Sequence, residues 1–447
     1  MSLFNDAMFY HIYPLGLCGA PKRNDFSKAV VNRLDYLHNW IEQAASLHLN
    51  AIYLGPLFES TAHGYDTADY FQVDRRLGTQ ADLLRLISTI KAQGMRVIFD
   101  GVFNHVGRDF WAFRDVQMNG RDSAYVDWFD HLNFEQRSPY GDGFSYQGWA
   151  GHFDLVKLNL RNPQVQQHLF DAVRYWVETY AIDGLRLDAA DVLDHDFIRA
   201  LATTCRSLKP DFWLMGEVVH GDYRRWANAE LLDATTNYEC YKGLYSSHVD
   251  ANYFEIAYSL NRQFGAEGRY RDLRLYSFAD NHDVNRVASS LSQAEHLYPL
   301  YLILFTMPGI PSIYYGSEWG ISGKRSRESD EALRPMLDLK DIDAFPNRDL
   351  AHAIRQFAVV RAALPALRHG DYQQLHVNHE QLAFARSTPE QTVVVVVNAS
   401  NKKQTLTLKL PQGSRLVDQL NQDCFPIADG RAAVTVYPHW GGVLVVE

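Results

Sequence analysis

Four apolar runs in this chain end on acidic residues, and this pattern restricts the fold more than any other feature. They lie at residues 96–105, 184–188, 213–217 and 278–283, and they place Asp100, Asp188, Glu217 and Asp283 at or just past their ends. Short runs rich in Val, Ile, Leu and Phe are typical of fully buried strands. A charge is costly inside a core unless it is paired. The pattern therefore predicts parallel strands whose carboxyl ends share one site, as in a (β/α)₈ barrel.

Strand-like and helix-like segments alternate along most of the chain, which favours βα units around a parallel sheet. Helices are expected over about 36–47, after Thr79, and over 163–180, where Pro163 fits a first turn. The strands are expected at residues 9–13, 50–55, 96–100, 184–188, 213–217, 234–241, 275–279 and 312–315. Eight such units match the (β/α)₈ count.

Two segments depart from this alternation. Residues 106–159 are rich in aromatic side chains and show no clear repeat, which indicates an insertion after the third strand. Beyond residue 368, alternating and β-branched runs such as 392–397 predict an antiparallel β-sandwich. We therefore predict a barrel formed by 1–105 and 160–368, an inserted domain at 106–159 and a C-terminal β-sandwich at 369–447.

The composition excludes several classes of protein. The net charge of −10 argues against a nucleic-acid partner, which requires a basic surface. No apolar run reaches the roughly 18 residues of a membrane span, and the first residues lack a signal-peptide core. We expect a cytoplasmic protein, although a secreted protein trimmed of its leader would give the same sequence. Aromatic residues make up 13 %, a surplus that suits sugar stacking, although core packing accounts for most of them.

The runs that end on acids resemble the signature regions of the α-amylase superfamily, glycoside hydrolase family 13. The matching stretches are residues 100–105, 184–190, 216–218 and 278–283, with further similarity at 63–67 and 309–318. These six stretches follow the family's order along nearly the whole chain. The resemblance implies a glycosidase with a (β/α)₈ barrel, a short B domain and a C-terminal β-sandwich.

The resemblance also implies roles for individual residues. Asp188 matches the nucleophile, Glu217 the acid/base and Asp283 the third acid, which binds ring hydroxyls. A retaining mechanism needs two carboxyl groups about 5–5.5 Å apart. Arg186 lies two positions before Asp188, so both side chains point to the same side of a strand. The substrate-binding residues implied are His63, Tyr65, His105, Arg186 and His282.

Some matching residues have a structural interpretation as well. Asp100 fits a buried carboxylate paired with an arginine better than a catalytic one. Asn104 fits either a calcium ligand or an amide that stabilises its loop. Trp111 and Trp149 fit either the core of the inserted domain or a sugar platform. No cofactor is expected to be required, and Asn104 is the one candidate for a calcium site.

Three departures from the family pattern bear on the branch and the cleft. Asp191 and Val192 stand where many α-amylases have a Lys-His pair, which weakens the case for calcium. Lys157 resembles the neopullulanase and cyclomaltodextrinase branch, although the chain as given lacks that branch's N-terminal β-domain. Ala62 stands where exo-acting α-glucosidases have an aspartate, which favours an open, endo-acting cleft.

The leading hypothesis is a retaining hydrolase of α-1,4 bonds in maltodextrins and starch-like α-glucans. An α-glucanotransferase, an α-glucosidase or a cyclomaltodextrinase would use the same catalytic residues. A non-catalytic amylase-like binding domain is the alternative from another class, and it conflicts with the three intact acids. The expected partner is an α-glucan, without nucleic acid or membrane. The sequence leaves open the linkage, the ratio of hydrolysis to transfer, and whether the protein is a monomer or a homodimer.

Overall fold

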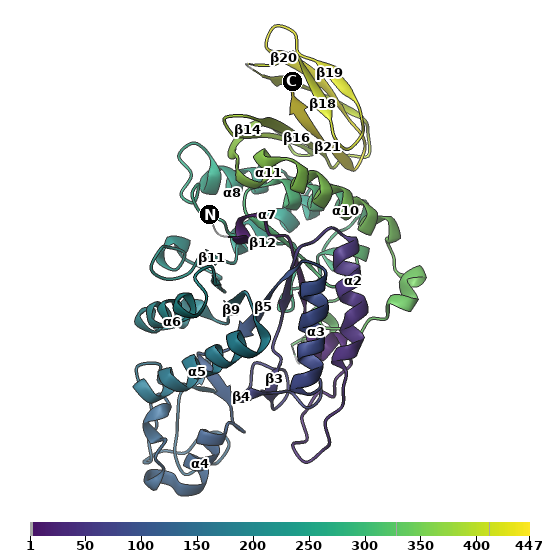
Figure 1. Cartoon of the computed structure of the whole chain (residues 1–447). Helices are drawn as coiled ribbons and strands as arrows, with labels where there is room; N and C mark the ends of the chain where they lie inside the picture. Colours follow the sequence, from purple (N-terminus) through teal and green to yellow (C-terminus); the bar gives the residue numbers. More distant parts are fainter. Residues whose placement is uncertain (1–2, 328, 411) are drawn as a thin grey trace.

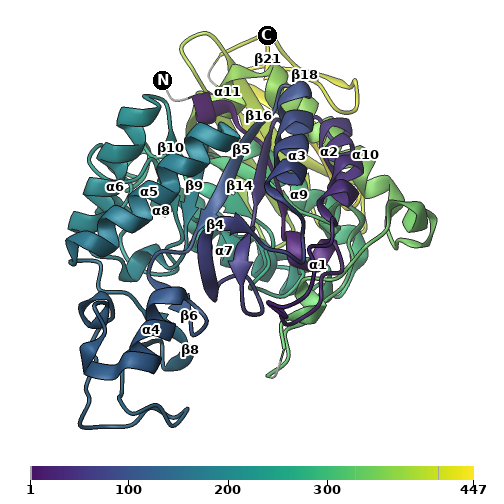
Figure 2. The ribbon, with the colours of Figure 1, turned by 60° about the horizontal axis from the view of Figure 1, so that its bottom comes forward.

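Eight parallel strands form the central barrel of the molecule (Figures 1 and 2). The structure is a computed structural model that describes residues 3–327, 329–410 and 412–447. The barrel strands are β1 (Phe9–Ile12), β2 (Ala51–Leu54), β5 (Arg96–Gly101), β9 (Gly184–Leu187), β10 (Trp213–Gly216), β11 (Ala234–Thr235), β12 (Tyr276–Phe278) and β13 (Ile310–Tyr314). Strand β1 pairs with β13, and a bridge from Thr236 to Tyr276 links the β11 and β12 edges. The predicted (β/α)₈ barrel is thereby confirmed.

Helices surround this barrel, and local side chains cap the starts of several of them. Thr79 and Asp82 form a capping box at the start of α3 (Gln80–Ala92), and Asn162 caps α5 (Pro163–Tyr180). The bounds of α5 are those that the sequence predicts. The other long helices are α2 (His38–Ser46), α6 (His195–Leu208), α7 (Tyr238–Val249), α8 (Phe254–Phe264), α9 (Leu297–Thr306) and α10 (Arg348–Ala363).

The sixth strand is much shorter than predicted. The sequence favours a strand over residues 234–241, but β11 ends at Thr235 and α7 begins at Tyr238. The Asn237 side chain accepts a hydrogen bond from the Cys240 backbone N–H, 3.1 Å away, and so caps the helix. The β-propensity of Tyr238 and Tyr241 is therefore overridden by a helix start immediately before them.

An apolar cluster fills the amino-terminal end of the barrel. Phe4, Phe9 and Trp213 stack on one another there, with the Phe4 and Trp213 ring centroids 4.8 Å apart. Ile310 and Phe278 belong to the same buried cluster. Apolar side chains therefore close the amino-terminal end of the barrel, and the polar site described below lies at the opposite end.

The segment between β5 and α5 projects from one side of the barrel (Figure 2). Its three antiparallel strands are β6 (His105–Gly107), β7 (Gly148–Trp149) and β8 (His152–Lys157), and its helix is α4 (Trp111–Asn119). Trp111 packs edge-on against Trp128, 5.4 Å between ring centroids, although 40 % of Trp111 remains exposed to solvent. The Trp149 ring lies 5.7 Å from the ring of His105 and lines a cavity.

The C-terminal region is antiparallel, as predicted, and lies at one end of the molecule (Figure 1). Its larger sheet contains β14 (Asp371–Val377), β15 (Gln381–Ser387), β16 (Thr392–Asn398), β21 (Trp440–Val446), β18 (Arg415–Asp418) and β19 (Cys424–Pro426). The smaller sheet pairs β17 (Gln404–Lys409) with β20 (Arg431–Val436). Val394, Leu408 and Val434 belong to the apolar cluster that both sheets share. The His296 ring joins this region to the barrel, because its two nitrogens lie 2.9 and 3.1 Å from the carbonyl oxygens of His248 and Ala399.

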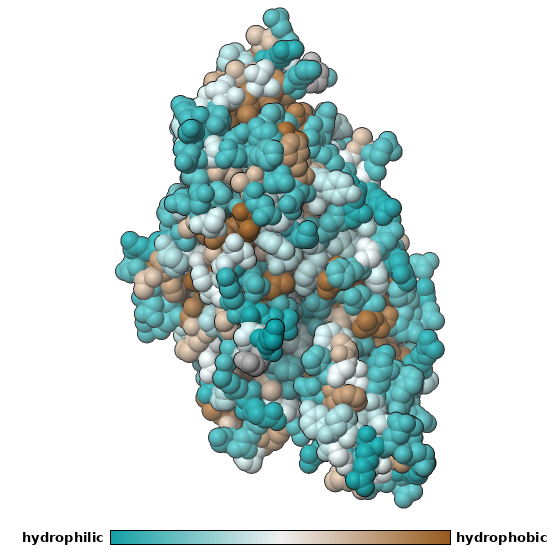
Figure 3. All heavy atoms as spheres, turned by 180° about the vertical axis from the view of Figure 1, so that it is seen from behind, coloured by the Kyte–Doolittle hydropathy of each residue, from teal (hydrophilic) through white to brown (hydrophobic). Residues whose placement is uncertain are grey.

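In the part of the chain that the structure describes, no helix combines the length and apolar character needed to cross a membrane. Hydrophilic side chains cover most of the face seen in Figure 3, and apolar side chains occur there in small, scattered groups.

Candidate active site

A cavity of about 460 Å³ lies at the carboxyl ends of the barrel strands. The strand register brings distant residues to it. Arg186 on β9 pairs with Asp100 on β5 and with Met215 on β10. The Glu217 backbone N–H then donates to the Leu187 carbonyl, 2.9 Å away. Six of the predicted site residues line this cavity: His63, Tyr65, His105, Asp188, Glu217 and Asp283.

Arg186 lies behind the cavity wall and contacts three carboxylates. Its Nη1 lies 2.9 Å from Asp100 Oδ1 and 2.8 Å from Asp188 Oδ1, and its Nη2 lies 2.8 Å from Glu217 Oε2. Only 3 % of the side chain is exposed, so water screens these contacts little. The guanidinium therefore fixes the two predicted catalytic carboxyl groups relative to each other.

Asp100 has its hydrogen-bonding capacity met inside the protein. Besides Arg186, the hydroxyls of Tyr53 and Tyr65 donate to its Oδ2 at 2.7 and 2.9 Å. Its side chain is fully buried and does not line the cavity. These contacts support the structural interpretation of Asp100 as a buried anchor for Arg186 and Tyr65.

The two carboxylate oxygens of Asp188 have different surroundings. Oδ1 accepts from Arg186, whereas Oδ2 lies 3.9 Å from His105 Nε2, beyond hydrogen-bonding distance. Burial raises the pKa of Asp188 well above its ordinary value, and the Arg186 guanidinium opposes that rise. Burial, with a smaller effect of His63, lowers the pKa of His105 to about 3, so this ring is neutral near pH 7. Oδ2 is therefore the oxygen of Asp188 that is left free to react.

Glu217 shows the same asymmetry. Its Oε2 forms an ion pair with Arg186 and accepts a hydrogen bond from the Ala189 backbone N–H, 3.0 Å away. Its Oε1 is approached by the hydroxyl of Tyr238 at 3.4 Å. Because Oε2 already faces the Arg186 cation and a backbone N–H, a proton on this carboxyl group belongs on Oε1.

Asp283 is held by two basic side chains. Its Oδ2 lies 2.8 Å from His282 Nε2, and its Oδ1 lies 2.9 Å from Arg334 Nη2. Although burial opposes the effect, His282 and Arg334 hold the pKa of Asp283 well below its ordinary value. His282 also contacts the Tyr65 hydroxyl, and the two rings stack with centroids 5.4 Å apart. Asp283 is therefore an anionic acceptor, and His282 supports it from behind the wall.

Sequence reasoning did not find several residues that complete this cavity. Arg334 lies in the long segment after β13, and Tyr238 is the first residue of a helix predicted as strand. His152 stacks on Trp149 with 6.0 Å between ring centroids, and both line the cavity. None of them belongs to a stretch that matches the family, and the helix cap at Asn237 is the only local signal near Tyr238.

The structure places Asn104 in the wall of another cavity that two carboxylates also line. The Asn104 Oδ1 is buried without a hydrogen-bond partner, but Ca²⁺ takes six to eight oxygen ligands, usually with carboxylates. The carboxylates that line the cavity beside Asn104 are engaged elsewhere, Asp130 with Lys157 at 3.4 Å and Asp194 with Arg161 at 3.0 Å. No cluster of three or more His, Cys, Asp or Glu side chains suited to a metal occurs within residues 3–327, 329–410 and 412–447. The Lys157 ammonium instead places a positive charge beside this cavity.

Comparison with known families agrees with this geometry. The model of the α-amylase catalytic domain matches residues 27–356. The chain belongs to the α-amylase family. The model of the maltogenic amylase C-terminal domain matches residues 372–441. This protein is therefore a glycosidase of the α-amylase type, and the hypothesis of a non-catalytic binding domain is not supported.

Relatives of this α-amylase family member identify its branch. Neopullulanase 2 of Thermoactinomyces vulgaris is 32 % identical over 433 residues, which cover 93 % of this chain and 70 % of that protein. A cyclomaltodextrinase of Geobacillus thermopakistaniensis is 31 % identical over 427 residues, which cover 93 % of this chain and 69 % of that protein. The resemblance of the chain to the neopullulanase and cyclomaltodextrinase branch is thus confirmed.

Solved structures show the same likeness over nearly the whole chain. A cyclomaltodextrinase superposes with a TM-score of 0.88 at 27 % identity, covering 99 % of this chain and 78 % of that one. The ligand-free cyclic α-maltosyl-(1→6)-maltose hydrolase of Arthrobacter globiformis gives a TM-score of 0.82 at 26 % identity. The superposition covers 100 % of this chain and 99 % of that one.

Proposed function

We propose that this enzyme hydrolyses α-1,4-glucosidic bonds in maltodextrins with retention of the anomeric configuration. The observation that carries this proposal is the Arg186 bridge. One guanidinium contacts Asp188 Oδ1 and Glu217 Oε2, each at 2.8 Å, and leaves Asp188 Oδ2 and Glu217 Oε1 unoccupied by it. Two carboxyl groups held by one planar group favour the narrow separation of about 5–5.5 Å used for retention over the wider spacing used for inversion.

In the first step, Asp188 Oδ2 attacks the anomeric carbon and forms a glycosyl ester. The bond from that carbon to the glycosidic oxygen breaks, and Glu217 transfers its proton from Oε1 to the leaving oxygen. The mechanism requires an ionised Asp188 and a proton on Glu217 Oε1, and the Arg186 guanidinium favours the ionised form of Asp188 by opposing the pKa rise that burial causes.

In the second step, the Glu217 carboxylate takes a proton from water, and the resulting oxygen attacks the anomeric carbon. The ester bond breaks, and Asp188 is released as a carboxylate. Two displacements at one carbon return the starting configuration.

The residues around the reacting carbon are suited to bind a glucosyl ring. Asp283 is anionic and partly exposed, so it accepts hydrogen bonds from ring hydroxyls. The Tyr65 ring is fixed by Asp100 and His282, and it offers an apolar surface to the sugar. The neutral ring of His105 lies 3.9 Å from Asp188, and its Nε2 has no hydrogen-bond partner in the protein, so it can donate to a sugar hydroxyl beside that carboxylate.

The cleft continues beyond this ring, which supports action on internal bonds. A second cavity of about 800 Å³ shares His63, Asp330 and Arg334 with the catalytic cavity and includes Ala62 in its wall. The methyl side chain of Ala62 cannot close this passage, so further sugars fit on the donor side.

The names of the relatives support an α-glucan substrate. They include cyclomaltodextrinases, a neopullulanase and a cyclic maltosyl-maltose hydrolase. Since one relative is the intracellular maltogenic amylase of Bacillus subtilis, 29 % identical over 400 residues, we also propose an intracellular maltodextrin as the substrate pool.

Proton NMR of maltoheptaose hydrolysis tests the proposal. The first product should carry an α-hemiacetal, which mutarotation then converts to the equilibrium mixture. A β-hemiacetal at the earliest times would establish inversion and would overturn the assignment of Asp188 as nucleophile. Parallel digests of pullulan and cyclodextrin, with products separated by size, measure the preference for linkage and for cyclic substrates.

A further inference from the structure

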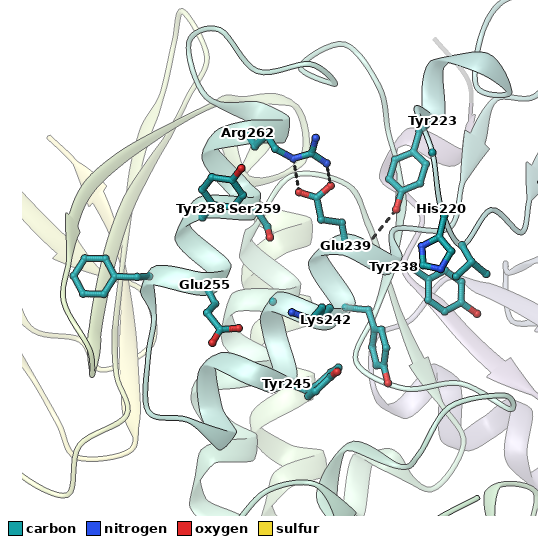
Figure 4. Close-up of a pocket in the computed structure, with 15 residues that line it drawn as sticks. His220, Tyr223, Tyr238, Glu239, Lys242, Tyr245, Glu255, Tyr258, Ser259 and Arg262 are labelled. Carbon is teal, nitrogen blue, oxygen red and sulfur yellow. Dashed lines mark hydrogen bonds and ion pairs between the residues drawn. The ribbon is translucent and has the colours of Figure 1, made fainter. Parts of the chain in front are cut away.

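A groove of about 990 Å³ lies between α7, α8 and the loop after β10 (Figure 4). It shares Val219 and Tyr238 with the catalytic cavity, so the two hollows adjoin. Tyr238 and His220 lie on one side of the groove, Glu255 and Tyr258 lie on the other, and Lys242 lies between them. The catalytic steps described above do not use this groove.

Tyrosine rings dominate the walls of the groove. Tyr241 and Tyr245 lie on one face of α7 with ring centroids 5.0 Å apart. On the opposite wall, α8 exposes 68 % of Tyr258 and 45 % of Phe254 to solvent. Large exposed aromatic side chains that border a concave surface are typical of ligand-binding sites. Each ring offers an apolar face, and each tyrosine hydroxyl can also form a hydrogen bond.

The polar side chains of the groove are balanced in charge. Glu239 and Glu255 stand against Lys242 and Arg262, and Arg262 Nε donates to Glu239 Oε1 at 2.8 Å. A site for a phosphorylated or strongly acidic ligand would instead have an excess of basic groups. Aromatic faces beside neutral and paired polar groups match a neutral ligand with many hydroxyls, as an α-glucan is.

The position of Glu217 fixes which end of the glucan would enter the groove. The Tyr238 hydroxyl approaches Glu217 Oε1 at 3.4 Å and accepts a hydrogen bond from Asn281 Nδ2 at 3.3 Å. The ring of Tyr238 also belongs to the wall of the groove. A general acid faces the leaving oxygen, so the groove that adjoins it lies on the leaving-group side of the scissile bond.

We propose that this groove binds the leaving-group portion of the α-glucan chain, with Tyr245 and Tyr258 as stacking platforms for sugars beyond the one next to the cleaved bond. The inference rests on the proposed function, because it uses Glu217 as the acid. The proposal adds a second substrate-binding surface outside the mouth of the barrel. This surface is formed by α7 and α8, which lie outside the six sequence stretches that resemble the family.

The test compares two substrates on the single variants Tyr245→Ala and Tyr258→Ala. α-Maltosyl fluoride places no sugar on the leaving-group side, whereas maltoheptaose can fill it. We expect each variant to lower kcat/KM for maltoheptaose about tenfold, and to lower kcat/KM for the fluoride much less. Tyr140→Ala is the matched control, because Tyr140 is 56 % exposed and lies outside the groove.

Maltoheptaose labelled at its reducing end gives a second readout that general destabilisation cannot imitate. If the groove holds leaving-group sugars, its loss should move cleavage toward bonds nearer the reducing end. Tyr258→Ala keeps this test valid should Tyr245→Ala fold poorly, because the exposed ring of Tyr258 packs little surface.

Unchanged cleavage positions in both variants, or equal losses on both substrates, would overturn the groove proposal. Failure of the proposed function would look different. In that case the unaltered enzyme would not turn over α-maltosyl fluoride, whatever the side chains at positions 245 and 258.

Discussion

Replacing Glu217 by glutamine tests the acid/base assignment with little disturbance of the fold. The side chain has an acceptor end and a reactive end in this structure. Oε2 forms an ion pair with Arg186 at 2.8 Å and accepts a hydrogen bond from the Ala189 N–H at 3.0 Å. An amide oxygen can take the place of Oε2 in both contacts, which directs the amide NH₂ of the variant into the position of Oε1. The variant therefore keeps its anchors but has no acidic proton beside Tyr238.

The size of the effect follows from the loss of proton transfer. General acid catalysis contributes about 10²–10⁴-fold, which corresponds to about 3–5 kcal/mol of barrier. Maltoheptaose has a sugar alkoxide as its leaving group and needs the whole contribution. Fluoride leaves with little protonation, so α-maltosyl fluoride should lose far less in the first step. The ratio of the two losses, and not either loss alone, reports the role of Glu217.

Steady-state kcat/KM on the two substrates measures this ratio, because kcat/KM covers the steps up to formation of the ester. Glu230→Gln is the matched control, since Glu230 is 72 % exposed and pairs only loosely with Arg199 at 3.4 Å. Equal losses on maltoheptaose and on the fluoride would refute the reasoning. They would show that Glu217 acts on binding or on folding instead of on the leaving group.

Three further predictions concern the nucleophile, calcium and a buried acid. Asp188→Asn should lower turnover by several orders of magnitude with substrate binding largely kept, and retention of more than about a tenth of the rate, under ~1.4 kcal/mol, would remove Asp188 as nucleophile. Dialysis against EDTA should leave activity and melting temperature nearly unchanged, because the carboxylates beside Asn104 are paired with Lys157 and Arg161. A fall of about ten degrees in melting temperature, reversed by calcium, would contradict this prediction. Burial raises the pKa of Glu318 from its ordinary 4.5 to about 7. Between these two values the native state holds a proton on Glu318 that the unfolded chain releases. The contribution of this proton to the free energy of unfolding is therefore full below pH 4.5, and about 3 kcal/mol of it is lost as the pH rises through 7. Glu318→Gln should remove that part of the pH dependence in chemical denaturation, and an unchanged slope between pH 4.5 and 7 would count against it.

The fold could be predicted where local signals and burial agree. The run at 184–188 is apolar apart from Arg186 and Asp188, and it forms a barrel strand as expected. Pro163 and the cap at Asn162 place the start of α5 at the predicted residue. The sixth strand was predicted too long, because tyrosines favour strands locally while the cap at Asn237 and the packing of α7 decide the outcome.

The candidate site could be predicted only in part. The two-residue period of a strand places Arg186 and Asp188 on one side, and the structure confirms their contact. The contact of Arg186 with Glu217 depends on the register between β9 and β10, which is a tertiary property. Arg334 reaches Asp283 from a segment with no regular pattern, so no local signal could identify it.

The shared guanidinium has a consequence for how this enzyme can change during evolution. A lysine at position 186 would supply one point charge, but not the separated donors that reach Asp100, Asp188 and Glu217 together. The effects of substitutions at these four positions should therefore not add, since each removes a partner on which the others depend. A substitution at one of them leaves the other three short of a partner, so a compensating change would have to occur at more than one position at once.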